Sequence, residues 1–122
     1  MNLTTRTPSE SVITAPANDY SPIAIDFRDA TGRVYGFPYA HLLHYFLEKN
    51  PASAHDPNVP PDRMVLSFST HDVTLLGWRL SNVLLWLGLA RISSIIVRDT
   101  RFANMDKEKA YISEISVKAV EN

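Results

Sequence analysis

The chain has 122 residues, of which 45% are hydrophobic and 20% are charged, and its formal net charge is −1. These values are typical of one globular domain that buries a core without disulfides. The near-neutral charge also weakens long-range attraction to nucleic acid or anionic membranes. The chain contains no cysteine, which excludes thiolate metal sites and cysteine nucleophiles and fits a reducing compartment.

The N-terminal segment has neither the basic start nor the apolar centre of a signal peptide. Residues 1–21 are rich in Ser, Thr and Pro, and we expect a flexible tail in which only residues 12–14 have strand character. The longest apolar run, residues 83–90, is far shorter than the ~20 residues of a membrane-spanning helix. We therefore expect a soluble, cytoplasmic protein with no membrane partner.

A first β-hairpin is predicted at residues 23–39. Apolar and polar residues alternate over 23–29, so Ile25 and Phe27 share one face of a strand. The sequence Asp-Ala-Thr-Gly at 29–32 is typical of a turn, because Asp bonds back to the backbone and Gly tolerates a positive φ.

Residues 38–50 fit two structures. A helix would begin at Pro38 and would carry an apolar stripe made of Leu42, Leu43, Phe46 and Leu47. A strand would instead place Tyr39, His41, Leu43, Tyr45 and Leu47 on one face, and Pro38 would favour an edge position or a bulge. We favour the helix slightly and keep both open. A loop with four prolines follows at residues 51–62.

A second hairpin is predicted around residues 64–78. Met64, Leu66 and Phe68 have one parity, whereas Val73 and Leu75 have the other. A four-residue turn at Ser69–Asp72 brings both sets to one face of the sheet.

Residues 79–91 are the strongest helix candidate. One face of this helix carries the apolar residues Leu80, Val83, Leu84 and Leu87. The opposite side carries a second apolar set, Leu85, Trp86 and Leu89, for which we expect a second subunit as the cover. The alternative is that the long loop or the tail covers it. Further strands are predicted at 92–99 and 111–120.

These elements predict one α+β domain at residues 22–120. We expect a mainly antiparallel sheet of two hairpins plus the later strands, either open or closed into a small barrel. One amphipathic helix packs on it, with a second at 38–50 if that segment is helical.

Four residues are weak candidates for a ligand or metal site. His41 and His44 would share a face only on a helix, and His71 or Asp72 could supply a third metal ligand. Neither Glu nor Cys accompanies these histidines at zincin spacing. We therefore expect ordinary histidines, with no metal and no cofactor.

Ser69, Thr70, His71 and Asp72 do not predict a catalytic triad. Three neighbours on one short turn cannot point at one another in the required relay, and the chain has no Gly-x-Ser-x-Gly motif. Phosphate-binding glycine loops are also absent from the sequence.

Nucleic-acid binding is not expected, although the chain contains basic and aromatic residues that could serve it. The basic residues are Arg79, Arg91, Arg98 and Arg101, and the aromatic residues are Tyr35, Phe37 and Tyr39. Asp99, Asp106 and Glu108 dilute the local positive charge.

The sequence therefore favours a non-catalytic binding or scaffolding module that self-associates, most simply as a dimer. An enzyme that depends on a metal or on His41, His44, His71 and Asp72 is the alternative. A nucleic-acid-binding domain is the weaker alternative.

Overall fold

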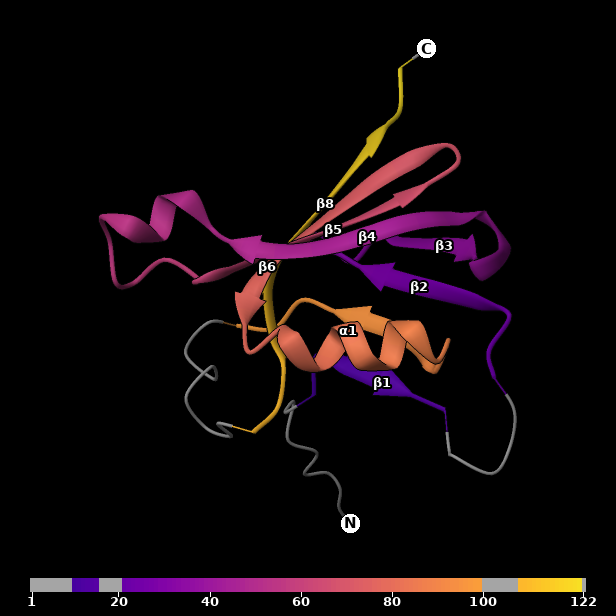
Figure 1. Cartoon of the computed structure of the whole chain (residues 1–122), viewed down its shortest axis with the longest axis horizontal. Coiled ribbons are helices and arrows are strands. Elements are labelled where there is room, and N and C mark those ends of the chain that lie inside the picture. The colour runs from indigo at the N-terminus through magenta and orange to yellow at the C-terminus, as the bar shows by residue number, and fades with distance from the viewer. Residues whose placement is uncertain (1–9, 16–20, 100–107, 122) are drawn as a thin grey trace.

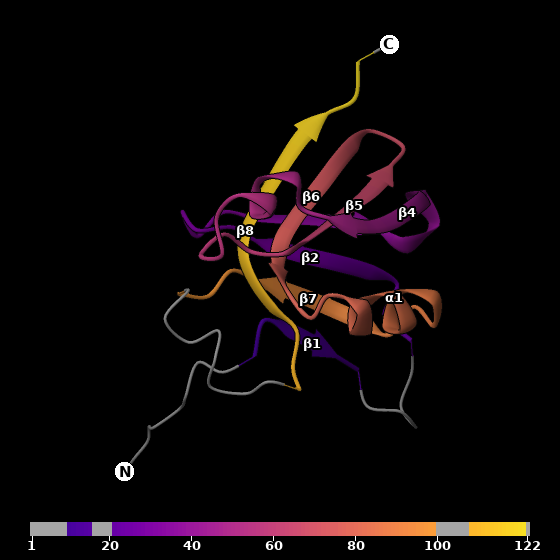
Figure 2. The same cartoon turned by 60° about the vertical axis from the view of Figure 1, so that its left-hand side comes forward.

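The computed structural model describes residues 10–15, 21–99 and 108–121, and these residues form two four-stranded sheets and one α-helix (Figures 1 and 2). Sheet A has the order β1-β7-β2-β3, with bounds Val12–Thr14, Ile92–Ile96, Ala24–Arg28 and Val34–Pro38. Sheet B has the order β4-β5-β6-β8, with bounds Leu42–Lys49, Asp62–Phe68, His71–Trp78 and Tyr111–Ala119.

The expected α+β class is confirmed. Among the described strands, β2 and β7 form the only parallel pair, and every other pair is antiparallel. The two predicted hairpins lie in different sheets, β2–β3 in sheet A and β5–β6 in sheet B. The small closed barrel is wrong, because each sheet ends in two edge strands.

One core joins the two sheets. Alternation in β2 buries Ile25 and Phe27 completely and leaves Asp26 exposed, as predicted. The Phe68 ring of sheet B lies 6.0 Å from the Phe27 ring and stacks at 4.5 Å on the Phe37 ring of sheet A. Burial of such aromatic side chains is a major source of core stability.

The turn between β2 and β3 follows the predicted chemistry. The carboxylate of Asp29 accepts hydrogen bonds from the backbone N–H of Thr31 and Arg33 and from the Thr31 hydroxyl. The hydroxyl bond is the main reason that the pKa of Asp29 is lowered. Gly32 has a φ of 91°, which a residue with a side chain rarely adopts.

Residues 38–50 form a strand rather than the slightly favoured helix. A 3₁₀ turn, η1, covers Tyr39–His41, and β4 follows and pairs with β5. A bulge between Leu42 and His44 shifts the parity, so that Leu42, Tyr45 and Leu47 all pack toward the core. Because of this change in parity, a simple alternation over residues 38–50 does not predict which side chains face the core.

The hairpin β5–β6 has a shorter turn than predicted. Ser69 and Thr70 alone connect the strands, and His71 and Asp72 are the first residues of β6. Leu66 pairs with Val73 and Met64 pairs with Leu75, so both apolar sets face the core as expected. A two-residue loop brings both apolar sets to one face of the sheet, as a four-residue turn would also do.

Part of the expected N-terminal tail is a strand. Val12–Thr14 pairs with β7, Val12 is buried, and the buried Ser11 hydroxyl oxygen accepts a hydrogen bond of 3.0 Å from Ile112 N. Residues 12–14 have strand character in the sequence, but the partners of these contacts are distant in sequence and carry no local signal. The rest of that tail, residues 1–9 and 16–20, lies outside the described residues.

The proline-rich segment is tied at its two ends by Asn50. Its side-chain nitrogen donates to Pro60 O at 2.8 Å, and its backbone N–H donates to Pro61 O. Asn50 also caps a second 3₁₀ turn, η2, at Pro51–Ala54, and Asp62 already belongs to β5.

The predicted helix is α1, Ser81–Gly88, which is shorter than the expected 79–91. Leu80 N donates to the Asp62 carboxylate at the start of the helix. At its end, Ala90 has a φ of 53° and Arg91 N donates to Trp86 O. This left-handed cap stops the helix.

Candidate functional site

The helix α1 presents two leucines away from the core. Leu80, Val83 and Leu87 are buried against the sheets, as predicted, whereas the Leu85 and Leu89 side chains are 65% and 57% exposed. Because α1 is anchored by its buried residues, these two leucines have a fixed position. We call Leu85 and Leu89 the α1 face.

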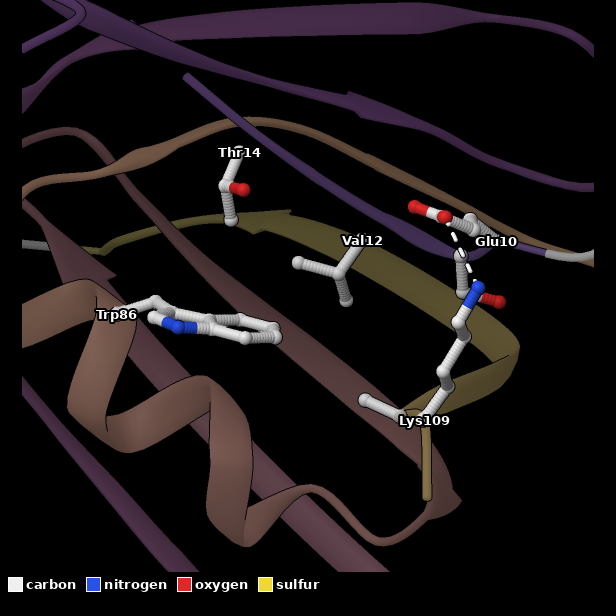
Figure 3. A pocket seen from close by; sticks show the side chains of 7 residues that line it. Glu10, Val12, Thr14, Trp86 and Lys109 are labelled. Carbon is white, nitrogen blue, oxygen red and sulfur yellow. Dashed lines mark hydrogen bonds and ion pairs between the residues drawn. The ribbon is translucent and has the colours of Figure 1, made fainter. Parts of the chain in front are cut away.

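Trp86, which we expected beside Leu85 and Leu89, is not part of the α1 face. Its indole is partly buried and lies beside β1, against a cavity of about 170 Å³ that Val12 and Thr14 also line (Figure 3). At the other end of this cavity, Lys109 Nζ lies 3.0 Å from Glu10 Oε2. The lining combines an indole, aliphatic groups and an exposed ion pair, which suits a small apolar group better than a reacting one.

A surface that the sequence did not single out lies next to α1. Leu80 N bonds to Asp62, the residue paired with Lys49, so α1 begins at the end of β4. At the other end of α1, a Cβ added to Gly88 would lie 3.4 Å from the Tyr45 hydroxyl. The helix therefore runs in the direction opposite to β4, with its start near the end of β4 and its end near Tyr45.

Two large apolar residues of β4 are exposed. Leu43, in the bulge, is 66% exposed, and Phe46 is 41% exposed on the outer face of sheet B. The strand interpretation of residues 38–50 could have found Phe46, because it places Phe46 opposite the side that carries Tyr45 and Leu47. The parity change at the bulge has no comparable sequence signal.

The four candidate ligand residues do not converge. His41 is in η1, His44 is on β4, and His71 and Asp72 point to opposite faces of β6. The His71 ring lies 5.4 Å from the Phe37 ring, and its Nδ1 is 2.8 Å from the Thr70 hydroxyl oxygen. In the described part of the chain, no three His, Asp or Glu side chains are grouped as a metal site would require.

Strand register does place two of these candidates in one row. His44 pairs with Ser67, which pairs in turn with Asp72, on the outer face of sheet B. Serine therefore lies between histidine and aspartate, whereas a catalytic triad needs histidine between the other two. This order excludes the relay geometry for the row.

Asp72 also borders a broad groove on the outer face of sheet B. The groove has a volume of about 610 Å³ and crosses β5, β6 and β8. Arg63 and Lys118 contribute positive charge to its lining, and Asp72 and Glu114 contribute negative charge. Mixed charges on an open surface of this kind do not select one class of ligand.

The arginines bind neighbouring backbone instead of forming a free basic patch. Arg79 donates to Lys109 O at 2.8 Å, Arg91 to Ala15 O at 2.8 Å, and Arg98 to Glu10 O at 3.1 Å. Arg101 lies outside the described residues. Of the aromatic candidates, Phe37 is in the core and the Tyr39 hydroxyl bonds to Ile92.

Comparisons with models of protein families, with curated proteins and with solved structures found no match to this chain. Within the residues described, α1 is too short to cross a membrane.

Proposed function

We propose that this chain is a non-catalytic binding or scaffolding module that self-associates as a symmetric dimer through the α1 face. The observation that carries the proposal is the exposure of Leu85 and Leu89 on one side of an anchored helix. Complete burial of a leucine side chain contributes about 1.5–3 kcal/mol, and both of these are more than half exposed. A second copy can cover both leucines by an isologous contact, which is the commonest form of homodimer.

The histidine-dependent enzyme is the weaker candidate, because His41, His44, His71 and Asp72 are spread over different elements and faces. The nucleic-acid alternative is weaker still, because the candidate arginines Arg79, Arg91 and Arg98 already bind backbone carbonyls. The absence of cysteine fits a cytoplasmic setting, which we include in the proposal.

The test is a double substitution, Leu85→Glu with Leu89→Lys. It leaves the net charge unchanged, and on an exposed surface it should change the free energy of unfolding by only ~0.5 kcal/mol. We expect a folded monomer by light scattering, with the circular dichroism of the unaltered chain. Trp86 should be left intact, because it packs against the core.

The matched control is Val34→Glu with Val120→Lys, which makes the same charge changes at exposed apolar residues of β3 and of the segment after β8. We expect this control to remain a dimer. A folded Leu85→Glu/Leu89→Lys variant with the native mass of the control would overturn the proposed interface.

A further inference from the structure

The strand β4 is an unpaired edge of sheet B. It pairs with β5 on one side. On its other side, within the described residues, the backbone groups of Leu42–Lys49 bond to no second strand. An edge strand of this kind is a ready template for pairing with another chain, and proteins normally blunt or cover it. The bulge at Leu42–His44 limits the regular part of this edge to His44–Lys49.

Strand geometry limits how two copies of this edge can meet. A two-fold axis normal to the sheet brings two β4 strands together in antiparallel fashion. Along a strand, the N–H and C=O groups of one residue point to one side, and those of the next residue point to the other side. Two residues directly opposite each other must therefore both point these groups toward the partner strand or both point them away from it. A symmetric ladder must therefore be centred on one residue that faces its own copy. The candidates for the centre are Tyr45, Phe46 and Leu47.

The Phe46 centre gives the most complementary pairs. Phe46 then faces Phe46 of the second copy, and His44 faces Glu48 in both directions. On the inner side of the strand, Tyr45 faces Leu47. Aromatic pairs and complementary polar pairs directly across a ladder are stabilising. His44, Phe46 and Glu48 are all exposed, so each is accessible to a second copy.

The other two centres are poorer. A ladder centred on Tyr45 places Glu48 opposite Leu42, inside the bulge. A ladder centred on Leu47 places Glu48 opposite Phe46 and His44 opposite Asn50. Asn50 is buried and already bonded to the proline-rich segment. The Glu48 carboxylate is already paired with Arg63 in its own chain. Only the Phe46 centre also places Glu48 opposite a polar side chain and keeps the ladder within His44–Glu48.

The edge is continuous with the α1 face. Leu85 lies three residues before Gly88, and therefore on the same side of the helix as the contact with Tyr45. A two-fold axis at Phe46 brings the second copy of α1 to the same side of the joined sheet. The two leucines and the β4 edge can thus belong to one interface.

We propose that β4 pairs with β4 of a second copy in an antiparallel ladder centred on Phe46, which joins two copies of sheet B into one sheet. This proposal rests on the proposed self-association and specifies its register. The occupant is a second copy of this chain, because the His44–Glu48 and Tyr45–Leu47 pairs are self-complementary.

The natural chain contains no cysteine, so single cysteines report the register cleanly. Residues directly opposite in an antiparallel ladder have Cβ atoms about 4.5–5.5 Å apart, close to the ~3.5–4.5 Å of a disulfide. Under mild oxidation, we expect full-length Phe46→Cys to form a disulfide-linked dimer. Val120→Cys, where the native side chain has the same 41% exposure as Phe46, should give no more than background linkage.

Mixtures of two variants, one of them carrying an affinity tag, identify the centre. His44→Cys mixed with Glu48→Cys should cross-link between unlike copies, and His44→Cys alone should not. Preferential linkage of His44→Cys with Phe46→Cys would place the centre at Tyr45, and linkage of Phe46→Cys with Glu48→Cys would place it at Leu47. Either result would overturn the Phe46 register.

The mass of the chain separates this inference from the proposed function. A dimer whose Phe46→Cys variant links no better than Val120→Cys would overturn the β4 ladder and leave the α1 interface standing. Efficient linkage of Phe46→Cys would support the ladder. If the Leu85→Glu/Leu89→Lys variant also remained a dimer, the α1 interface would be overturned. A monomer at all concentrations would overturn both.

Discussion

The Tyr39 hydroxyl joins η1, the connection between the two sheets, to β7 of sheet A. The Tyr39 O–H donates to Ile92 O at 2.7 Å, and its oxygen accepts from Ile92 N–H at 3.1 Å. Burial raises the pKa of Tyr39 to about 12, whereas an unfolded tyrosine titrates near ~10. The neutral hydroxyl therefore contributes stability that is fully present below pH ~10 and is lost as the pH rises through ~12.

Tyr39→Phe should lower the free energy of unfolding by about 1–2 kcal/mol at neutral pH, because Ile92 N–H and C=O each lose a hydrogen bond to the hydroxyl. The variant should also lose less stability than the unaltered chain between pH ~10 and ~12. Urea unfolding at these pH values measures both effects. Tyr35→Phe is the control, since the Tyr35 hydroxyl accepts only an exposed bond from Arg33. Equal alkaline losses in Tyr39→Phe and the unaltered chain would contradict this role.

At the residue scale, turn chemistry was predictable from neighbouring residues, whereas the relative positions of side chains distant in sequence were not. The Asp29–Gly32 turn depends on neighbours only, and it formed as predicted. The weak candidate metal site combined His41 and His44, which share a face only on a helix, with His71 or Asp72. His41 lies in a 3₁₀ turn and His44 on a strand instead.

Among the elements, the start of β1 connects sheet A to sheet B through Ser11, the residue that precedes the strand. Ser11 O accepts a hydrogen bond from Ile96 N of β7, and its hydroxyl oxygen accepts one from Ile112 N of β8. Ser11→Ala should lower the free energy of unfolding by about 1–3 kcal/mol, because it leaves a buried N–H without its partner.

The control for this prediction is Ser93→Ala, which removes only an exposed hydroxyl that donates to Ile13 O. Chemical denaturation should show a change of ~0.5 kcal/mol or less for this control. If Ser11→Ala were equally mild, the proposed role of β1 in joining the sheets would be wrong.

Element type was predictable where the pattern was long and regular, as in α1 and β8. It was not predictable where tertiary contacts overrode the local pattern. Residues 38–50 carry apolar residues at both helix and strand spacing, and pairing with β5 decides between them. The strand β1 has three residues, and its stability comes from β7 and β8, which are distant in sequence.

At the scale of the whole molecule, half of the exposed large apolar side chains in the described residues belong to two neighbouring elements. Leu85 and Leu89 lie on α1 and its C-cap, and Leu43 and Phe46 lie on β4, whereas Ile13, Ile23, Val34 and Val120 lie elsewhere. The sequence predicted an excess apolar surface on the helix, but it could not show that this surface continues along a sheet edge. That continuity arises from α1 running beside β4, which only the folded chain shows.

The central claim is self-association, and the most direct test is the native mass of the unaltered chain. Light scattering at several concentrations should give twice the 13.7 kDa of one chain, with dissociation on dilution if the interface is small. A mass of one chain at every concentration would contradict the claim, because the α1 face and the β4 edge would then have no second copy to cover them.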